Sequence, residues 1–428
     1  MIRHLALFTL FCCNIFIIQA QKNNSETLRY PEMVSAFYTL LDKQNFWTGD
    51  TAAASLRNKF LTVIDSAENW GLAGNDYHYT ALHELVKIAP GEEDSGILKR
   101  CELIFTDAAI SFFKDLYEGS NNNARHDELS SKYTEINKRI ILNKLVALCN
   151  GNCFEGVINS LEPAGDAYAV LKSEYQRQAA SHSFYNMMQL KRTLNYLRWI
   201  NHFKFERYIV VNIPSAELSY YQADTVTLRM RVVVGKPSTR TPRFAAYCNK
   251  VILYPYWNVP ASITNKELLP LFRKSPGLIE DMKMQVIDNN GKIIDPSSLN
   301  WSSYNKYNFP YRLRQSTGCD NALGVMKFNL TDPFNVYMHD TNNKLAFLQS
   351  NRFYSHGCIR IEKPLELANL ILPTPVDSTF IQSCLKDEKP MELDLTNTVP
   401  VFVIYSTAGI NADNNVVYYK DVYKLLKR

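Results

Sequence analysis

The sequence lacks the short motifs that usually mark a zinc site or a bound nucleic acid. It contains no C-x-x-C pair and no H-E-x-x-H, so the common zinc-ligand spacings are missing. Its net charge of +5 over 428 residues is mild and forms no basic stripe. After residue 20 no apolar run approaches the ~20 residues that span a bilayer. We therefore expect no metal ion and no nucleic-acid partner.

The composition is that of an ordinary globular protein. Hydrophobic residues make up 46% of the chain and charged residues 21%, which argues against disorder. The length allows two or three domains with ample core. The mild positive charge suits polyanionic surroundings, such as a polymer that bears carboxylates.

The N-terminus is typical of a secretory signal. A short basic stretch, Met1 to His4, precedes an apolar run from Leu5 to Ile18, and Ala20 offers a small residue for cleavage. Ile18 is larger than ideal three places before the cut. We predict a signal peptide over residues 1–20 and export to the periplasm or cell-wall space. An uncleaved membrane anchor is the second interpretation.

Two halves with different periodicity follow the signal. Residues 21–204 favour helices: apolar residues from Leu56 to Ala67 recur at helical spacing before Gly71, and a second helix is expected to begin at Asp107 and end near Gly119. The five histidines of this half are scattered, and we expect each to be structural. From Arg207 onward the period is two.

The second half predicts a β-rich domain over residues 205–428. Expected strands are 208–214, 217–221, 226–234 and 247–254, followed after the centre of the domain by a helix at 364–372 and strands at 399–406 and 416–423. Residues 262–319 interrupt this pattern with short helical pieces, turns and aromatic residues. They are either an ordinary decorated loop or a mobile lid.

A candidate nucleophile lies in the run Ser355-His356-Gly357-Cys358-Ile359-Arg360, with His339 upstream. A thiol attacks as its thiolate, and its ordinary pKa near ~8.5 leaves only a small reactive fraction at neutral pH. A histidine within reach can take the thiol proton and later return it to a leaving amine. The alternative is a purely structural role, with a buried cysteine beside a solvated histidine. The length of the motif argues against this alternative.

These residues resemble the signature of the L,D-transpeptidase (YkuD-type) catalytic domain. That signature is a histidine followed, after fourteen to seventeen residues, by Ser/Thr-His-Gly-Cys, and residues 340–354 fit the spacing. The first half is similar to the helical scaffold of the YcbB-like branch, without its small peptidoglycan-binding module. The resemblance implies an α+β protein: a helical scaffold domain, then a β-rich catalytic domain with a capping insertion at about 262–319.

The resemblance also implies catalytic roles. Cys358 is the expected nucleophile and His339 the expected base and acid, although His356 is nearer to Cys358 in sequence and is kept as a site-shaping residue together with Ser355. The main-chain oxygen of Asp340 is expected to orient the His339 imidazole, with its carboxylate as an added influence.

Further residues are expected to contact the substrate. The N–H groups of Gly357 and Cys358 would form much of an oxyanion hole, with Tyr337 as a contributor. Arg360 either binds a substrate carboxylate or forms a structural salt bridge. Trp257 either lines the donor groove or packs in the core.

The implied activity is peptidoglycan L,D-transpeptidation. A stem tetrapeptide would lose D-alanine to Cys358, and a second stem amine would complete a 3-3 crosslink, without any cofactor. Carbapenems are expected to acylate Cys358, and no stable protein partner is inferred. Open alternatives are an L,D-carboxypeptidase, transfer to a protein or a D-amino acid, and a non-catalytic wall-binding protein.

Cysteine counting leaves the disulfides open. Nine cysteines minus the two in the signal leave seven, and a free Cys358 leaves six for at most three bridges. Cys149 and Cys153 are close enough in sequence to pair. Sequence alone does not give the connectivity.

Overall fold

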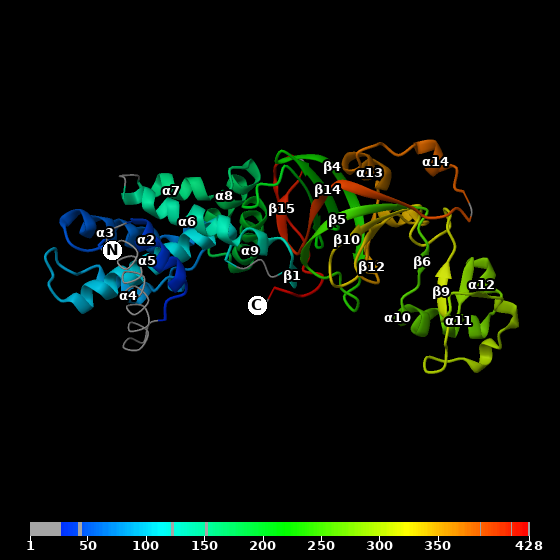
Figure 1. Cartoon of the computed structure of the whole chain (residues 1–428). Helices are drawn as coiled ribbons and strands as arrows, with labels where there is room; N and C mark the ends of the chain where they lie inside the picture. Colours follow the sequence, from blue (N-terminus) through cyan, green and yellow to red (C-terminus); the bar gives the residue numbers. More distant parts are fainter. Residues whose placement is uncertain are drawn as a thin grey trace. The chain divides into compact units, whose positions relative to one another are not determined.

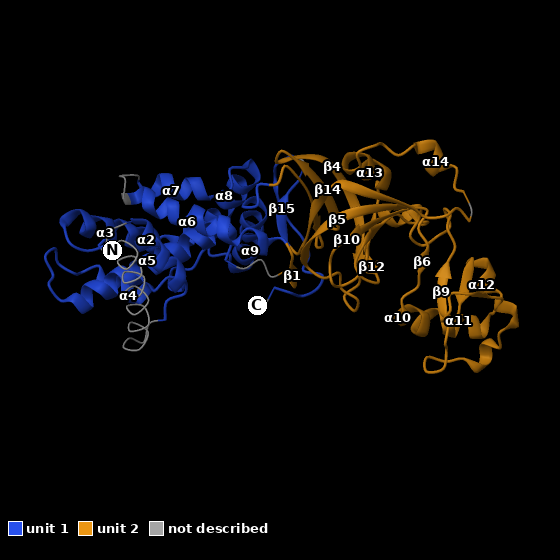
Figure 2. Cartoon of the chain, in the orientation of Figure 1, with its two compact units in different colours: residues 1–123, 129–204, 406–428 blue, residues 124–128, 205–405 orange. Residues whose placement is uncertain are grey.

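The chain folds into two compact units, which Figure 2 distinguishes by colour. Unit 1 comprises residues 1–123, 129–204 and 406–428, and unit 2 comprises residues 124–128 and 205–405. The computed structural model describes residues 27–41, 45–120, 124–149, 153–385, 387–411 and 413–426. The signal predicted over residues 1–20 lies outside these ranges and stays a prediction. Of the helices within them, none has both the length and the apolar character needed to cross a membrane.

Unit 1 is built mainly from helices (Figure 1). They are α2 (Pro31–Leu41), α3 (Thr51–Asp65), α4 (Tyr79–Leu85), α5 (Ser95–Glu118), α6 (Thr134–Cys149), α7 (Phe154–Leu161), α8 (Asp166–Ala180) and α9 (Phe184–Asn201). Short 3₁₀ turns lie at Ala67–Trp70, Gly74–Asp76 and Ser130–Lys132. Gly71, predicted to cap the helix that became α3, instead ends the first of these turns with a φ of 66°, because α3 stops at Asp65 with Ser66 as its cap. The expected helical scaffold is confirmed.

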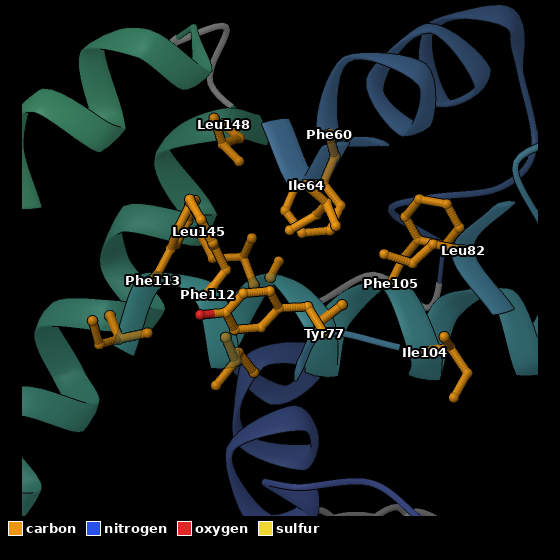
Figure 3. Packing of buried hydrophobic residues seen from close by; sticks show 14 of the residues in the cluster. Phe60, Ile64, Tyr77, Leu82, Ile104, Phe105, Phe112, Phe113, Leu145 and Leu148 are labelled. Carbon is orange, nitrogen blue, oxygen red and sulfur yellow. The ribbon is translucent and has the colours of Figure 1, made fainter. Parts of the chain in front are cut away.

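Helix α5 is the centre of the core of unit 1. Most of its residues from Cys101 to Tyr117 are buried, so neighbouring elements cover nearly its whole circumference. Figure 3 shows Phe105, Phe112 and Phe113 of this helix among side chains from neighbouring helices. These neighbours include Phe60, Ile64, Leu82, Leu145 and Leu148.

The prediction that a helix begins at Asp107 is wrong. Helix α5 begins at Ser95, where the carboxylate of Asp94 accepts the N–H groups of the next turn. Asp107 lies buried inside the helix and accepts the N–H groups of Arg29 and Tyr30 at 2.9 and 2.7 Å. It therefore caps a segment distant in sequence, which no local pattern indicates.

Unit 2 is organised around a ten-stranded sheet (Figure 1). Its strands are β1 (His126–Asp127), β2 (Arg207–Asn212), β3 (Glu217–Gln222), β4 (Thr225–Gly235), β5 (Phe244–Leu253), β10 (Met326–Leu330), β11 (Met338–His339), β12 (Phe353–Ser355), β13 (Ile359–Ile361) and β14 (Met391–Ile404). The order is β1-β5-β10-β11-β13-β4-β3-β2-β14, with β12 beside β4. Because β14 also pairs with β5, the path closes on itself.

Shorter elements complete unit 2 and the end of unit 1. Helices α13 (Pro364–Ile371) and α14 (Ser378–Gln382) and a 3₁₀ turn (Lys344–Leu348) belong to unit 2. Strands β15 (Ala408–Ile410) and β16 (Val416–Tyr418) form a separate two-stranded sheet in unit 1. Residues 406–428, assigned from sequence to the catalytic domain, lie with α9, where Thr193 and Ser406 share a hydrogen bond of 2.6 Å.

The interrupted segment of unit 2 is a small folded subdomain. It contains α10 (Ala261–Ile263), a π-helix (Thr264–Leu268), α11 (Leu269–Lys274), α12 (Leu278–Asp281), 3₁₀ turns (Pro296–Ser298 and Trp301–Ser303) and strands β6 (Trp257–Asn258), β7 (Met284–Ile287), β8 (Ile293–Ile294) and β9 (Arg312–Gln315). The strands form a sheet in the order β6-β9-β7-β8. A hydrophobic cluster that includes Phe272, Val286 and Trp301 fills it. We call residues 257–315 the insertion; its sheet was not predicted.

One disulfide lies just after the insertion in the chain. Cys319 is bonded to Cys384, across a sequence separation of 65 residues. Beside it, the Ser316 hydroxyl donates to Asp387 at 2.7 Å. Cys153 is a free cysteine whose sulfur accepts the N–H of Gly156, whereas the side chain of Cys149 lies outside the described residues. The pairing of Cys149 with Cys153 therefore stays untested.

Candidate active site

The predicted base and nucleophile lie on neighbouring strands. His339 ends β11, and Cys358 immediately precedes β13, which runs parallel to β11. The register pairs His339 with Arg360, and the N–H of Ile359 donates to the oxygen of Tyr337 at 3.1 Å. Directly paired residues project to one side of a sheet, so His339 and Arg360 share a face, and Tyr337 interacts with Cys358 on the segments that lead into these strands. The rings of Tyr337 and His339 lie 5.5 Å apart.

The turn that carries Cys358 is fixed by its own serine. The Ser355 hydroxyl donates to the main-chain oxygen of Cys358 at 2.7 Å and accepts the N–H of Gly357 at 3.1 Å. Gly357 has a φ of 124°, a conformation that favours glycine. One predicted oxyanion donor, the Gly357 N–H, is therefore engaged by Ser355. The N–H of Cys358 has no hydrogen-bond partner among the described residues.

Two threonines that the sequence analysis missed secure the same turn. Thr239 donates to the oxygen of Ser355 at 2.9 Å, and Thr241 donates to the oxygen of Gly357 at 2.7 Å. Both follow strand β4, whose end pairs with Ser355 through Gly235. A Cβ at Gly235 would lie 2.1 Å from the oxygen of Thr239, so this close approach requires glycine. No signal in the local sequence connects this segment with Cys358.

The groups around Cys358 shift the pKa of its thiol in opposite directions. Burial raises the pKa of the thiol, whereas hydrogen bonds from the main chain and hydroxyl of Tyr337 lower it, as does the charge of Lys327. The sulfur lies 4.0 Å from the main-chain oxygen of Asn335, a residue with a positive φ of 55°. Cys358 is thus a half-buried thiol with groups nearby that stabilise its thiolate.

His339 is a buried, neutral imidazole, with 5% of its surface exposed. Burial lowers its pKa to about 3, and the charges of Arg360 and Lys327 act in the same direction. The main-chain oxygen of Asp340 acts in the opposite direction and raises the pKa. Nδ1 is nevertheless buried without a hydrogen-bond partner in the described structure. A neutral ring at neutral pH is the form that a general base requires.

The carboxylate of Asp340 is engaged away from the imidazole. It accepts the N–H of Val325 at 3.1 Å and forms an ion pair with Lys344. It also lies against Gly324, where a Cβ would come within 2.4 Å of the carboxylate. An added influence of this carboxylate on His339, weighed from sequence, therefore has no hydrogen bond to support it.

Three further predicted residues, His356, Arg360 and Trp257, have different contacts in the structure. His356 is partly exposed and its Nε2 lies 2.7 Å from Oε1 of Glu267 in the insertion. Arg360 lies 5.9 Å from the ring centre of Tyr354 and forms no ion pair with a described residue. Trp257, in β6, interacts with the hydroxyl of Tyr337 and lowers its pKa, against the dominant effect of burial, which raises it.

The site is built from side chains and main-chain groups. Within the ranges that the structure describes, no group of three His, Cys, Asp or Glu side chains could hold a metal ion. The arrangement offers a nucleophilic sulfur, a neutral base and an unengaged N–H donor, which are the parts needed for acyl transfer through a tetrahedral intermediate.

Two segments of the chain match the sequence models of known domains. Residues 206–377 match the sequence model of the YkuD family, the L,D-transpeptidase catalytic domain. Residues 32–174 match the model of a scaffold domain. A candidate L,D-transpeptidase of Haemophilus influenzae is 38% identical over 220 residues, which cover 51% of this chain and 44% of that protein. The matched segment thus spans less than half of the relative.

Solved structures of the same name are more distant. An L,D-transpeptidase from Mycobacterium smegmatis has 15% identity and a TM-score of 0.20, with 46% of this chain and 58% of that chain covered. The catalytic domain of an E. faecium L,D-transpeptidase acylated by ertapenem has 15% identity and a TM-score of 0.17, with 46% and 97% covered. The likeness to this family therefore comes from the sequence comparisons.

Proposed function

Because residues 206–377 belong to the YkuD-type L,D-transpeptidase catalytic domain family, we propose that this protein is a peptidoglycan L,D-transpeptidase with Cys358 as nucleophile. The observation that carries the proposal is the pairing of β11 with β13, which brings His339 beside the segment that carries Cys358. The hydroxyl of Tyr337, which hydrogen-bonds the thiol, adds support. We further propose that the chain acts after export, in the periplasm or cell-wall space.

The donor half-reaction forms a thioester. His339 takes the proton of Cys358 as sulfur attacks the carbonyl carbon between the third residue of the stem, a diamino acid, and the terminal D-alanine. The N–H of Cys358 donates to the developing oxyanion. The C–N bond then breaks, His339 returns the proton to the departing amine, and D-alanine leaves.

The acceptor half-reaction restores the enzyme. A side-chain amine of a second stem attacks the thioester carbonyl and gives a proton to His339. The C–S bond breaks, the thiolate recovers that proton, and the product is an amide that joins two third-position residues. Water in place of the amine would make the protein an L,D-carboxypeptidase, and a protein amine or a D-amino acid would give other products.

The neutral resting states of the Cys358 thiol and the His339 imidazole suit this order of reaction steps. A thiol with a raised pKa and an imidazole with a lowered one exchange a proton only as the attack proceeds, so the site carries no reactive thiolate at rest. Carbapenems offer a strained amide to the same sulfur, and we propose that they acylate Cys358.

The test is incubation of the purified chain with a disaccharide-tetrapeptide, followed by mass analysis of protein and muropeptides. A protein adduct and 3-3 linked dimers, both absent with Cys358→Ala, are expected. Tripeptide alone would mean hydrolysis, and an adduct only with another amine would mean a different acceptor. Unchanged protein and substrate would refute catalysis and favour a wall-binding protein.

A further inference from the structure

Lys327 lies beside the catalytic residues, although it is outside the motif that the sequence analysis singled out. The register of β10 with β11 pairs Lys327 with His339, and the register of β11 with β13 pairs His339 with Arg360. Directly paired residues project from the same face of a sheet. The imidazole of His339 is therefore flanked on one face by an ammonium group and a guanidinium group.

Contacts place the Lys327 ammonium on the side of the nucleophile. Its Nζ lies 4.4 Å from the centre of the Tyr337 ring, whose hydroxyl hydrogen-bonds the Cys358 thiol. The charge of Lys327 lowers the pKa of the Cys358 thiol, as expected for a cation near the sulfur. The same charge acts on His339.

Both cations lack a compensating carboxylate. Burial lowers the pKa of Lys327 and of Arg360, and neither residue forms an ion pair within the described part of the chain. Glu392 raises the pKa of Lys327 from a distance, but its carboxylate is already ion-paired with Lys250. A partly buried charge without a partner costs free energy. Two such charges beside a nucleophile are explained when the substrate supplies the anion.

We propose that Lys327, together with Arg360, forms an anion subsite that binds the terminal carboxylate of the acyl donor, and that Lys327 determines the preference for a free acid at that end. The inference rests on the proposed function, because it assigns a subsite to the same reaction. The terminal carboxylate of the donor is one residue beyond the amide that the thiol attacks, so it must lie close to the sulfur. Lys327, whose Nζ lies 4.4 Å from the centre of the Tyr337 ring, is a cation that acts on the sulfur.

The test compares two donors that differ only in charge. The full chain is incubated with a disaccharide-tetrapeptide that ends in D-alanine or in D-alaninamide, and kcat/KM is measured from release of the terminal residue. We expect the unmodified chain to prefer the acid by about 10- to 100-fold, the range of a charge-assisted hydrogen bond. Lys327→Gln should lose this preference by slowing the acid donor alone, and Lys327→Arg should retain it.

A matched control is Lys250→Gln, because Lys250 is a strand lysine of the same sheet that is already ion-paired. It should leave the ratio of the two donors unchanged. Equal slowing of both donors by Lys327→Gln would overturn the subsite and assign Lys327 to the thiol or the fold. An unmodified chain that uses the acid and the amide donor equally well would also overturn the subsite. A chain that releases neither terminal residue would instead refute the proposed function on which the inference rests.

Discussion

The hydroxyl of Thr241 donates to the main-chain oxygen of Gly357 at 2.7 Å and accepts the N–H of Gly235 at 2.9 Å. One buried side chain thus links the end of β4 to the turn that presents Cys358. Two side chains therefore hold the turn: Thr241, which lies far from it in sequence, and Ser355, which is part of it. The position of the sulfur therefore depends on a residue that is remote from it in sequence.

Thr241→Val should slow acylation without unfolding the chain. Valine keeps the shape but removes the hydrogen bonds of the Thr241 hydroxyl to the N–H of Gly235 and the oxygen of Gly357, so the turn loosens. We expect the rate of Cys358 acylation by a carbapenem to fall about 10- to 100-fold, since misplacement of a reacting atom is costly. The measurement is intact mass against time. Thr241→Ser, which keeps the hydroxyl, is the control, and an equal loss with serine would contradict the role of the hydrogen bonds.

His339 should make stability depend on pH. Its pKa is about 3 in the fold against an ordinary 6.5, so between these values the unfolded chain binds the extra proton. Stability from the neutral ring is therefore fully present above pH 6.5 and is lost as the pH falls toward 3. The loss at pH 5 should be about 2 kcal/mol.

The variant His339→Gln, which does not titrate, isolates this contribution. Urea unfolding of both proteins at pH 7 and pH 5 gives the two free energies of unfolding. The unmodified chain should lose about 2 kcal/mol more than the variant on acidification. Parallel behaviour of the two proteins would show that the imidazole is not held neutral by burial.

Loss of the Cys319–Cys384 disulfide should destabilise unit 2. The bond closes a loop of 65 residues, and bridges of this kind contribute about 2–4 kcal/mol. We expect Cys319→Ser with Cys384→Ser to lower the free energy of unfolding of this unit by that amount, measured by denaturant titration. Cys153→Ser should have little effect, because Cys153 is free and exposed. A destabilised Cys153 variant and an unaffected double variant would reverse the assignment.

Glu102→Ala should destabilise unit 1 strongly. Its buried carboxylate accepts the N–H groups of Phe46, Trp47 and Thr48 at 2.8 to 3.1 Å, and alanine leaves these donors without a partner. A loss of at least about 2 kcal/mol is expected in thermal or denaturant unfolding. Glu84→Ala, which breaks an exposed pair with Arg100, should change the free energy of unfolding much less. Equal losses of stability in the Glu102 and Glu84 variants would show that the hydrogen bonds of Glu102 to these N–H groups contribute little.

Much of the sheet and the catalytic pair could be predicted because their signals are local. The alternation from Val226 to Val234 predicts strand β4, and the run from Ser355 to Arg360 with His339 upstream predicts the reacting groups. In both cases the residues that carry the signal are neighbours in sequence. Periodicity and motif spacing are then sufficient.

The rest of the site depends on strand register, which such signals do not contain. Lys327 meets His339 only because β10 and β11 pair with that register, and Thr241 reaches Gly357 only because β4 runs beside β12. The sheet of the insertion escaped prediction because β6 and β8 have two residues each, too few for alternation. Asp107 was misjudged because its capping partners lie far away in sequence.

The closing of the main sheet by β14 has a consequence for how the protein folds. Val401 pairs with Ile209 of β2 and with Ala246 of β5, residues that come much earlier in the chain. Until β14 arrives, β2 and β5 each present an unpaired edge, which can pair with another chain. Contacts between such distant residues form slowly. The arrival of β14 is thus the step that removes the opportunity for aggregation, and a chain cut before it should aggregate more readily than the full chain.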